Sequence, residues 1–211
     1  MTTSAPPGNR FERRRAATRQ ALVRAARQIL AESGDTSVSI QAIAERADVG
    51  FGSFYNHFES KADLFDAAVT DALAEYGEAV DGHLSGLEDP AELVSAGVRL
   101  SAGMAESHPE IMEILRHRGL GQIHSARGLA PWALRDLERG VTSGRFVVDA
   151  PAVALSVLGG SLLGLLQLGC SRPDIDRDEA AQNMAEMLLH MLGVPRDEAR
   201  DIARRPLPDI R

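Results

Sequence analysis

The 211-residue chain contains one cysteine, Cys170, and aromatic residues make up only 4% of it. A single cysteine excludes a disulfide within the chain and a cysteine-rich metal site. No segment alternates apolar and polar residues for long enough to predict a β-strand, whereas apolar residues recur at helical spacing throughout. The sequence therefore predicts an all-α protein, and a chain of this length can bury a substantial core without cross-links.

The motifs of common enzyme classes are also missing. There is no G-x-S-x-G, no H-E-x-x-H and no G-x-x-x-x-G-K, and no pair of histidines has a convincing metal-ligand spacing. The first residues are polar, include two prolines and lack the apolar segment of a signal peptide. We therefore expect a cytoplasmic protein that is not an enzyme and uses neither a metal nor a cofactor.

Positive charge is concentrated near the N-terminus, although the chain as a whole has a formal net charge of −7. Residues 1–61 hold nine basic and six acidic residues, and residues 10–27 hold seven arginines against a single acidic residue, Glu12. Binding to phosphate depends on the charge near the contact and not on the net charge of the chain. The negative net charge therefore does not exclude binding of nucleic acid. The alternative is a solvated, arginine-rich helix face.

The most informative stretch, residues 39–63, has the pattern of two short helices joined by a tight turn. Ser39 is suited to cap a first helix, in which Ile43 and Ala44 belong to one apolar face. Asp48 and Gly50 then interrupt the apolar period with residue types that tolerate turn conformations. This arrangement is typical of a DNA-reading unit.

A second helix is expected over residues 51–58, with Phe54 and Phe58 buried at a four-residue spacing. Ser60 is placed to cap a third helix, and Lys61 follows in its first turn, where the helix dipole disfavours a cation. A phosphate partner would explain Lys61. The other faces of the second helix carry small and polar residues, namely Gly52, Ser53, Tyr55, Asn56 and His57.

The segment VGFGSFYNHFESK at residues 49–61, preceded by IAERA at residues 43–47, resembles the DNA-binding region of the TetR family of transcriptional regulators. The resemblance covers about residues 12–70 by motif, and the rest by helix count, length and an apolar helix near the C-terminal end. It implies a homodimer that places the helix over residues 51–58 in a major groove of a double-stranded, palindromic operator. It also implies a small-molecule effector.

The resemblance assigns roles to individual positions. Bases would be contacted by Gln41, Phe51, Gly52, Ser53 and Asn56, and the phosphate backbone by Ser39, Tyr55, His57 and Lys61. Phe51 could instead pack against the first helix, and Tyr55 and His57 could simply be half-buried helix residues. Two positions depart from the family pattern, because Asp48 stands where glycine is usual and Gly50 where serine or threonine is common.

Proline and glycine place the remaining boundaries. We expect helices over residues 9–33, 60–80, 90–106, 109–118, 131–142, 150–170, 176–192 and 195–204. The predicted organisation is a disordered N-terminus (1–9), a helix-turn-helix DNA-binding domain (10–60), a C-terminal helical ligand-binding and dimerisation domain (61–204) and a tail (205–211). The helix over residues 60–80 would connect the cavity to the reading unit.

Residues 150–171 hold no charged side chain and are long enough to span a bilayer. The polar Gln167 and the acidic amphipathic helix that follows argue against insertion. Small residues at four-residue spacing let helices approach closely, and in the family this helix and the next form the subunit interface. The resemblance assigns to that interface Ser156, Gly160, Gly164, Met184, Met187, Leu188 and Met191. A buried helix of a monomer and a membrane-associated helix are the alternatives.

A ligand cavity in the C-terminal domain is also implied by the resemblance. Its predicted lining is Leu100, Met104, Met112, Leu115, Trp132, Leu137, Leu163 and Gln167, and polar anchors could come from His108, His117 and His124. Residues 119–131 would be a mobile loop over an entrance or an ordinary connection. The predicted function is a homodimeric, ligand-responsive transcriptional regulator, most simply a repressor; the alternative is a helical protein-interaction module that does not bind DNA.

Overall fold

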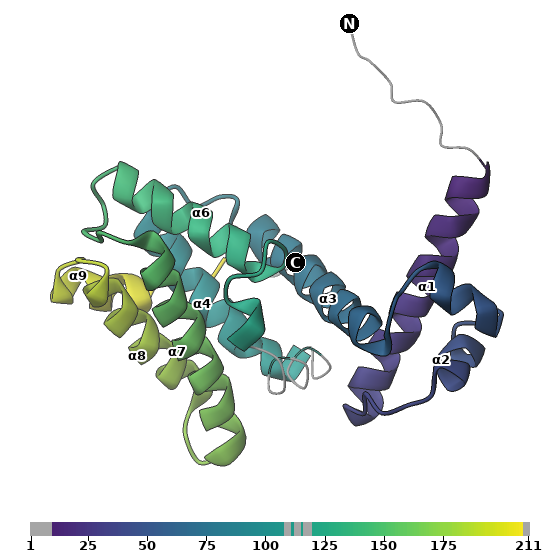
Figure 1. The fold of residues 1–211 in the computed structure, drawn as a ribbon. Coiled ribbons are helices and arrows are strands. Elements are labelled where there is room, and N and C mark those ends of the chain that lie inside the picture. Colours follow the sequence, from purple (N-terminus) through teal and green to yellow (C-terminus); the bar gives the residue numbers. More distant parts are fainter. Residues whose placement is uncertain (1–9, 108–110, 112–114, 116–119, 209–211) are drawn as a thin grey trace, which may run out of the picture. The chain divides into compact units, whose positions relative to one another are not determined.

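The computed structural model describes residues 10–107, 111, 115 and 120–208 (Figure 1). Helices are the only regular elements of these residues, so the predicted all-α fold is confirmed. The predicted disordered N-terminus and most of the predicted helix over residues 109–118 lie outside the described residues. The chain divides into two compact units, Met1–Val69 and Thr70–Arg211.

Unit 1 contains α1 (Arg10–Ser33), α2 (Ile40–Arg46), a 3-10 helix η1 (Phe51–Asn56) and the first turns of α3 (Lys61–Leu84). Helix α1 ends where Gly34 adopts a positive φ of 64° and its N–H donates to the carbonyl of Leu30 over 3.0 Å. The largest fully buried side chains of this unit are Leu22, Ile43, Phe54, Leu64 and Phe65.

The second helix of the predicted pair is a 3-10 helix, and it ends at Asn56, two residues before the expected end at residue 58. The N–H of Ser53 donates to the carbonyl of Gly50 over 2.8 Å, which is the three-residue spacing of a 3-10 turn. Gly50 makes no side-chain cap at its start, and Gly52 lowers helix propensity inside it. The segment is therefore held by its buried phenylalanines rather than by its own helix-forming tendency.

Unit 2 contains the rest of α3, α4 (Pro90–Ser107), α6 (Leu129–Thr142), α7 (Pro151–Ser171), α8 (Arg177–Met191) and α9 (Arg196–Ala203). Helix α4 packs against α6, α7, α8 and α9 and lies in the middle of this unit (Figure 1). Fully buried residues of its core include Leu137, Leu189, Leu192 and Ile202. The predicted boundaries of α4, α6, α7, α8 and α9 differ from the observed ones by one or two residues, whereas α3 runs four residues beyond its predicted end at residue 80.

Two segments are placed differently from the predicted organisation. Residues 61–69 of α3 cluster with unit 1, and Leu64 and Phe65 are fully buried there, so the division falls after Val69 instead of after residue 60. Residues 205–208 of the predicted tail pack on α4, because Leu207 joins an apolar cluster and Arg205 pairs with Glu92. The last residues of the chain lie outside the described part.

We expect the Gly140→Ala substitution in α6 to destabilise unit 2 by about 1–3 kcal/mol, since overpacking a dense core costs that much. A Cβ atom at Gly140 would lie 2.8 Å from Cγ of the buried Phe146 and closer to other ring atoms. Chemical denaturation measures the difference in the free energy of unfolding, provided that the two proteins show the same dependence on denaturant concentration. Gly82→Ala in α3 is the control, because nothing lies within 4 Å of its Cβ position; equal stability losses for both variants would contradict the packing argument.

Candidate DNA-binding surface and ligand cavity

The turn between α2 and η1 has the geometry that its residue types indicate. Ser39 caps α2, since its hydroxyl accepts a hydrogen bond from the N–H of Ala42 over 3.2 Å. Asp48 has a φ of 53°, in the left-handed region that favours glycine and that aspartate tolerates. Asp48, which stands where the family usually has glycine, therefore adopts the same left-handed backbone conformation that glycine would favour.

Helix η1 exposes one side and buries the other. Phe54 is fully buried and Phe58 is 5% exposed, as predicted, whereas Phe51 and Tyr55 are 55% and 59% exposed. The rings of Phe51 and Tyr55 meet edge to face, with centroids 6.2 Å apart. The exposure of Phe51 favours its solvent-facing interpretation over packing against α2, the first helix of the pair. Gly52 and Asn56 are also exposed, and Ser53 and His57 are half-buried.

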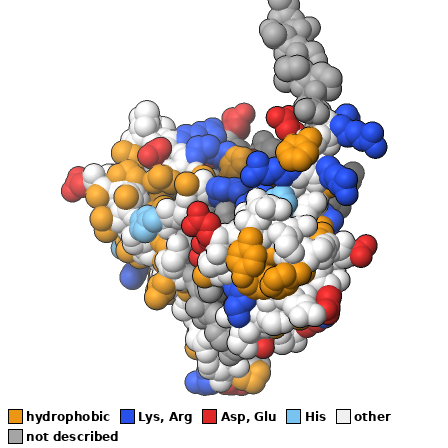
Figure 2. Space-filling view, turned by 45° about the vertical axis from the view of Figure 1, so that its right-hand side comes forward, with side chains coloured by type: hydrophobic (Ala, Val, Ile, Leu, Met, Phe, Trp, Pro, Cys, Tyr) orange, Lys and Arg blue, Asp and Glu red, His pale blue; other side chains and the backbone are white. Residues whose placement is uncertain are grey.

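Arginines of α1 lie beside this surface. Cζ of Arg19 lies 5.0 Å from the centroid of the Phe58 ring, a cation–π geometry. Burial lowers the pKa of His57 below its ordinary value, and the charges of Arg15 and Arg19 lower it further. Figure 2 shows basic side chains gathered at the start of α1. The positive charge predicted from the sequence is thus concentrated next to η1.

Lys61 has partners that its sequence position did not indicate. Its ammonium donates to the carbonyls of Ser37 and Val38 over 2.9 and 3.0 Å, which fixes the loop between α1 and α2. These two hydrogen bonds account for a cation in the first turn of α3, and an ammonium group has a third donor left. Gln41 is exposed and donates to Glu45 one turn along α2, over 3.0 Å.

Unit 2 contains a half-open cavity of about 130 Å³ between α3, α4, α6 and α7, with Gln122 and Ile123 from the segment before α6. Leu115, Trp132 and Leu163 line it. Leu100 and Leu137 are buried in the apolar clusters of the core and are not among the residues that line the cavity. Gln167 is exposed and donates to Ser171.

The other residues of the predicted cavity have no described contacts with it. The side chain of Met104, together with Met112, His108 and His117, lies outside the described residues. His124 lies at the surface, where its Nε2 is 2.8 Å from Oγ of Ser156 on α7. The residues of the 119–131 segment that line the cavity are Gln122, Ile123, Leu129 and Ala130.

The cavity has a charged edge that sequence reasoning missed. Arg135 donates to Asp81 over 2.7 Å and to Asp136 over 2.8 Å, and both carboxylates line the cavity. Burial raises the pKa of Asp136, although Arg135 opposes this shift. In a linear sequence these residues look like an ordinary solvated helix face. The only available signal was that Asp136 directly precedes the core residue Leu137.

Helices α7 and α8 present an uncovered apolar face. Val153, Val157 and Leu168 of α7 are exposed, as are Met187 and Met191 of α8. Nothing lies within 4 Å of the Cβ positions of Gly160 and Gly164. Helix α7 is long and apolar enough to cross a membrane by length and composition, and only 28% of its most apolar window is buried within the chain.

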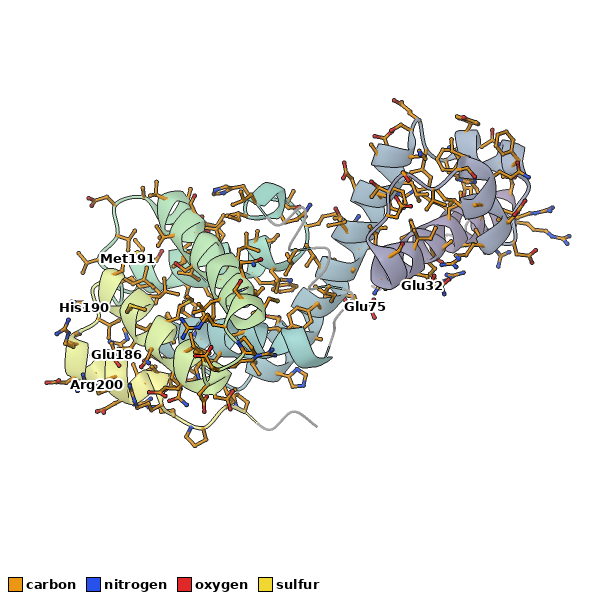
Figure 3. The ribbon with its side chains drawn as sticks, turned by 90° about the horizontal axis from the view of Figure 1, so that it is seen from below. Glu32, Glu75, Glu186, His190, Met191 and Arg200 are labelled. Carbon is orange, nitrogen blue, oxygen red and sulfur yellow. The ribbon has the colours of Figure 1, made fainter. Side chains whose placement is uncertain are left out.

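Not every residue predicted for a subunit interface lies on this face. Leu188 is buried in the core of unit 2 and Met184 packs partly against that core, because both point toward the inside of the helical layer. Ser156 is exposed but holds a hydrogen bond to His124. Another side of α8 is covered by α9, where Glu186 lies beside Arg200 (Figure 3).

Comparisons with known proteins identify the family from both units. A model described as "Bacterial regulatory proteins, tetR family" matches residues 22–68, and "Tetracyclin repressor-like, C-terminal domain" matches residues 89–205. The chain belongs to the TetR family. It is a DNA-binding, helix-turn-helix transcriptional regulator of that family, as the segment over residues 49–61 predicted.

Individual TetR-family proteins show how far the similarity extends. The crystal structure of RolR in complex with resorcinol is 32% identical, covers 95% of this chain and 100% of that chain, and has a TM-score of 0.71. UidR of Escherichia coli strain K12 is 36% identical over 69 residues, which is 31% of this chain and 35% of UidR, so the match spans about a third of that relative. FadR of Bacillus subtilis in complex with stearoyl-CoA, at 14% identity and a TM-score of 0.59, shares the fold alone.

We expect His57 to titrate in the folded protein with a pKa below 6.5, because burial and two arginines disfavour its charged form. The unfolded chain then binds more protons as the pH falls through 6.5, so the free energy of unfolding decreases from that pH downward. NMR titration of the His57 ring measures the pKa. Arg15→Gln should raise it part of the way toward 6.5, and Arg24→Gln, an exposed arginine of the same helix, should leave it unchanged. Equal effects of both variants would contradict the proximity of Arg15.

Proposed function

We propose that this TetR-family regulator is a cytoplasmic homodimer that represses transcription from a palindromic operator and leaves it when a small molecule enters unit 2. The observation that carries the DNA-binding part is the exposed side of η1. Phe51, Tyr55 and Asn56 face solvent on a segment whose opposite side is anchored in the core. An interaction module without DNA would leave these side chains and the neighbouring arginines without a role.

The proposed division of DNA contacts follows from chemistry and position. Gln41, Phe51, Gly52, Ser53 and Asn56 would read base edges, where amides can pair with adenine and apolar groups contact the thymine methyl. Ser39, Tyr55, His57 and Lys61 would hold phosphates. Arg15 and Arg19, which lie close enough to lower the pKa of His57, supply positive charge for the same backbone.

The homodimer is supported by the uncovered face of α7 and α8. Contiguous apolar patches are rarely left in water by monomeric proteins. Two copies of this face, related by a two-fold axis, would cover each other in a four-helix arrangement in which Gly160 and Gly164 let the α7 helices approach closely. Two reading units would then meet half-sites about 34 Å apart.

The effector is supported by the cavity and by a similar protein. RolR, similar over most of this chain, has a crystal structure with resorcinol. Leu73, Gly77 and Val80 of α3 line the cavity, and the same helix begins at Lys61 beside the reading element. A ligand that binds better to a conformation with mismatched reading units would shift the equilibrium away from DNA. We propose that α3 transmits this shift.

We expect the protein to bind DNA from upstream of its own coding region, and Asn56→Ala to change its preference among base-pair variants of that site. Tyr55→Phe should weaken binding about tenfold at all sites, since a phosphate hydrogen bond is lost without loss of base contact. Fluorescence anisotropy at two salt concentrations measures both effects. Asn183→Ala in α8 is the matched control. Binding that ignores salt and sequence would contradict a role as a regulator.

We expect Met187→Glu to convert the dimer into a monomer, because it places a charge in the middle of the exposed face of α8, where Met187 is 64% exposed. Sedimentation velocity measures the oligomeric state. Phe11→Glu, an exposed apolar residue of α1, should leave the dimer intact. A wild-type protein that sediments as a monomer at micromolar concentration would exclude this interface.

A further inference from the structure

The size of the cavity limits its occupant. An apolar cavity of about 150 Å³ holds one benzene molecule, and the cavity of unit 2 has a volume of about 130 Å³. Its lining is mostly aliphatic, with side chains such as Leu84, Val98 and Leu158. A single six-membered ring fits this space.

Gln122 gives the cavity an unused hydrogen-bond acceptor. Its side chain lines the cavity, and its Oε1 atom is buried without accepting a hydrogen bond from any residue in the described part of the chain. A buried acceptor without a donor destabilises the protein, because it has lost its hydrogen bonds to water. A ligand that supplies an O–H or N–H donor at this point removes that cost.

The charges of the lining disfavour an anion. Asp81 and Asp136 are the charged residues among the described lining; both accept hydrogen bonds from Arg135, and the charge of Arg139 also acts on Asp136. Both hydrogen bonds that Arg135 makes to Asp136 go to Oδ1. Oδ2 accepts none from the described residues and remains a second acceptor. A carboxylate ligand would meet repulsion at this edge.

Trp132 forms a fixed aromatic wall. Its ring lies against Gly77, where a Cβ atom would come within 3.0 Å of Cδ1 and 3.1 Å of Nε1. Cζ of Arg135 lies 5.0 Å from the ring centroid, so the same arginine holds both the carboxylates and the indole. An aromatic ligand can stack or meet edge to face with this wall.

We propose that the cavity binds an uncharged, single-ring aromatic alcohol, a phenol or a dihydroxybenzene, whose hydroxyl donates to Oε1 of Gln122. The hydroxyl satisfies the buried acceptor, and the ring fills the apolar volume beside Trp132. A second hydroxyl has Asp136 as its acceptor. The regulatory meaning of this ligand class rests on the proposed function, whereas the binding itself does not.

Calorimetry with the full-length protein tests the ligand class. Phenol and resorcinol are the neutral donors, toluene has the ring without a donor, and benzoate is the anion. Binding is also followed through the fluorescence of Trp132, the only tryptophan of the chain. We expect phenol to bind about tenfold more tightly than toluene, because one hydrogen bond is worth about that factor, and benzoate to bind more weakly than either.

Gln122→Leu tests the named acceptor. It should weaken phenol about tenfold and leave toluene unchanged, and Gln28→Leu, an exposed glutamine of α1, should change neither. Equal affinities of the wild-type protein for phenol and toluene, tighter binding of benzoate, or no binding of phenol would each overturn the proposal. The comparison of phenol, toluene and benzoate on the wild-type protein tests the ligand class even if the Gln122→Leu variant does not fold.

A parallel anisotropy assay of operator release distinguishes the proposed ligand class from the proposed release of DNA by a ligand. Phenol or resorcinol that binds in the cavity without releasing DNA would uphold the ligand class and contradict ligand-released repression. Release of DNA by benzoate, without binding of phenol, would uphold repression and overturn the ligand class.

Discussion

The burial of Phe54 and Phe58 determines which side chains of η1 face solvent on unit 1. Helix η1 has six residues, too few to be stable alone, and it has no side-chain cap. Each buried ring contributes about 1.5–3 kcal/mol through removal of apolar surface from water. Because these two rings set the rotation of η1, Phe51, Tyr55 and Asn56 face solvent as a group.

Charge in unit 1 is arranged around the same anchor. Arg19 lies over the Phe58 ring, and with Arg15 it disfavours a proton on the half-buried His57. Lys61 donates to two carbonyls of the loop before α2, which joins the elements of the unit and leaves its third N–H available. Unit 1 therefore has a basic surface near η1, although the chain as a whole has a net charge of −7.

Unit 2 keeps polar groups where an apolar core would be more stable. Asp136 is buried against Arg135, and Gln122 retains an acceptor without a partner. Such groups cost free energy in the isolated chain, and proteins tolerate that cost mainly at functional sites. The exposed apolar face of α7 and α8 also costs free energy in the isolated chain, and association of two copies through this face would remove that cost.

The sequence alone determined the all-α class, most helix limits, the burial of Phe54 and Phe58 and the family, because helical periodicity, caps and the 49–61 motif are local properties. It could not determine that η1 is a 3-10 helix, that Lys61 binds two carbonyls 23 and 24 residues away, or that Leu188 is a core residue. Tertiary structure also brought Asp81 and Gln122 to one cavity with Trp132 from three separate segments. The physical reason is that contacts between distant segments depend on how amphipathic helices rotate to bury their apolar faces together, and that rotation is decided only when the whole core packs.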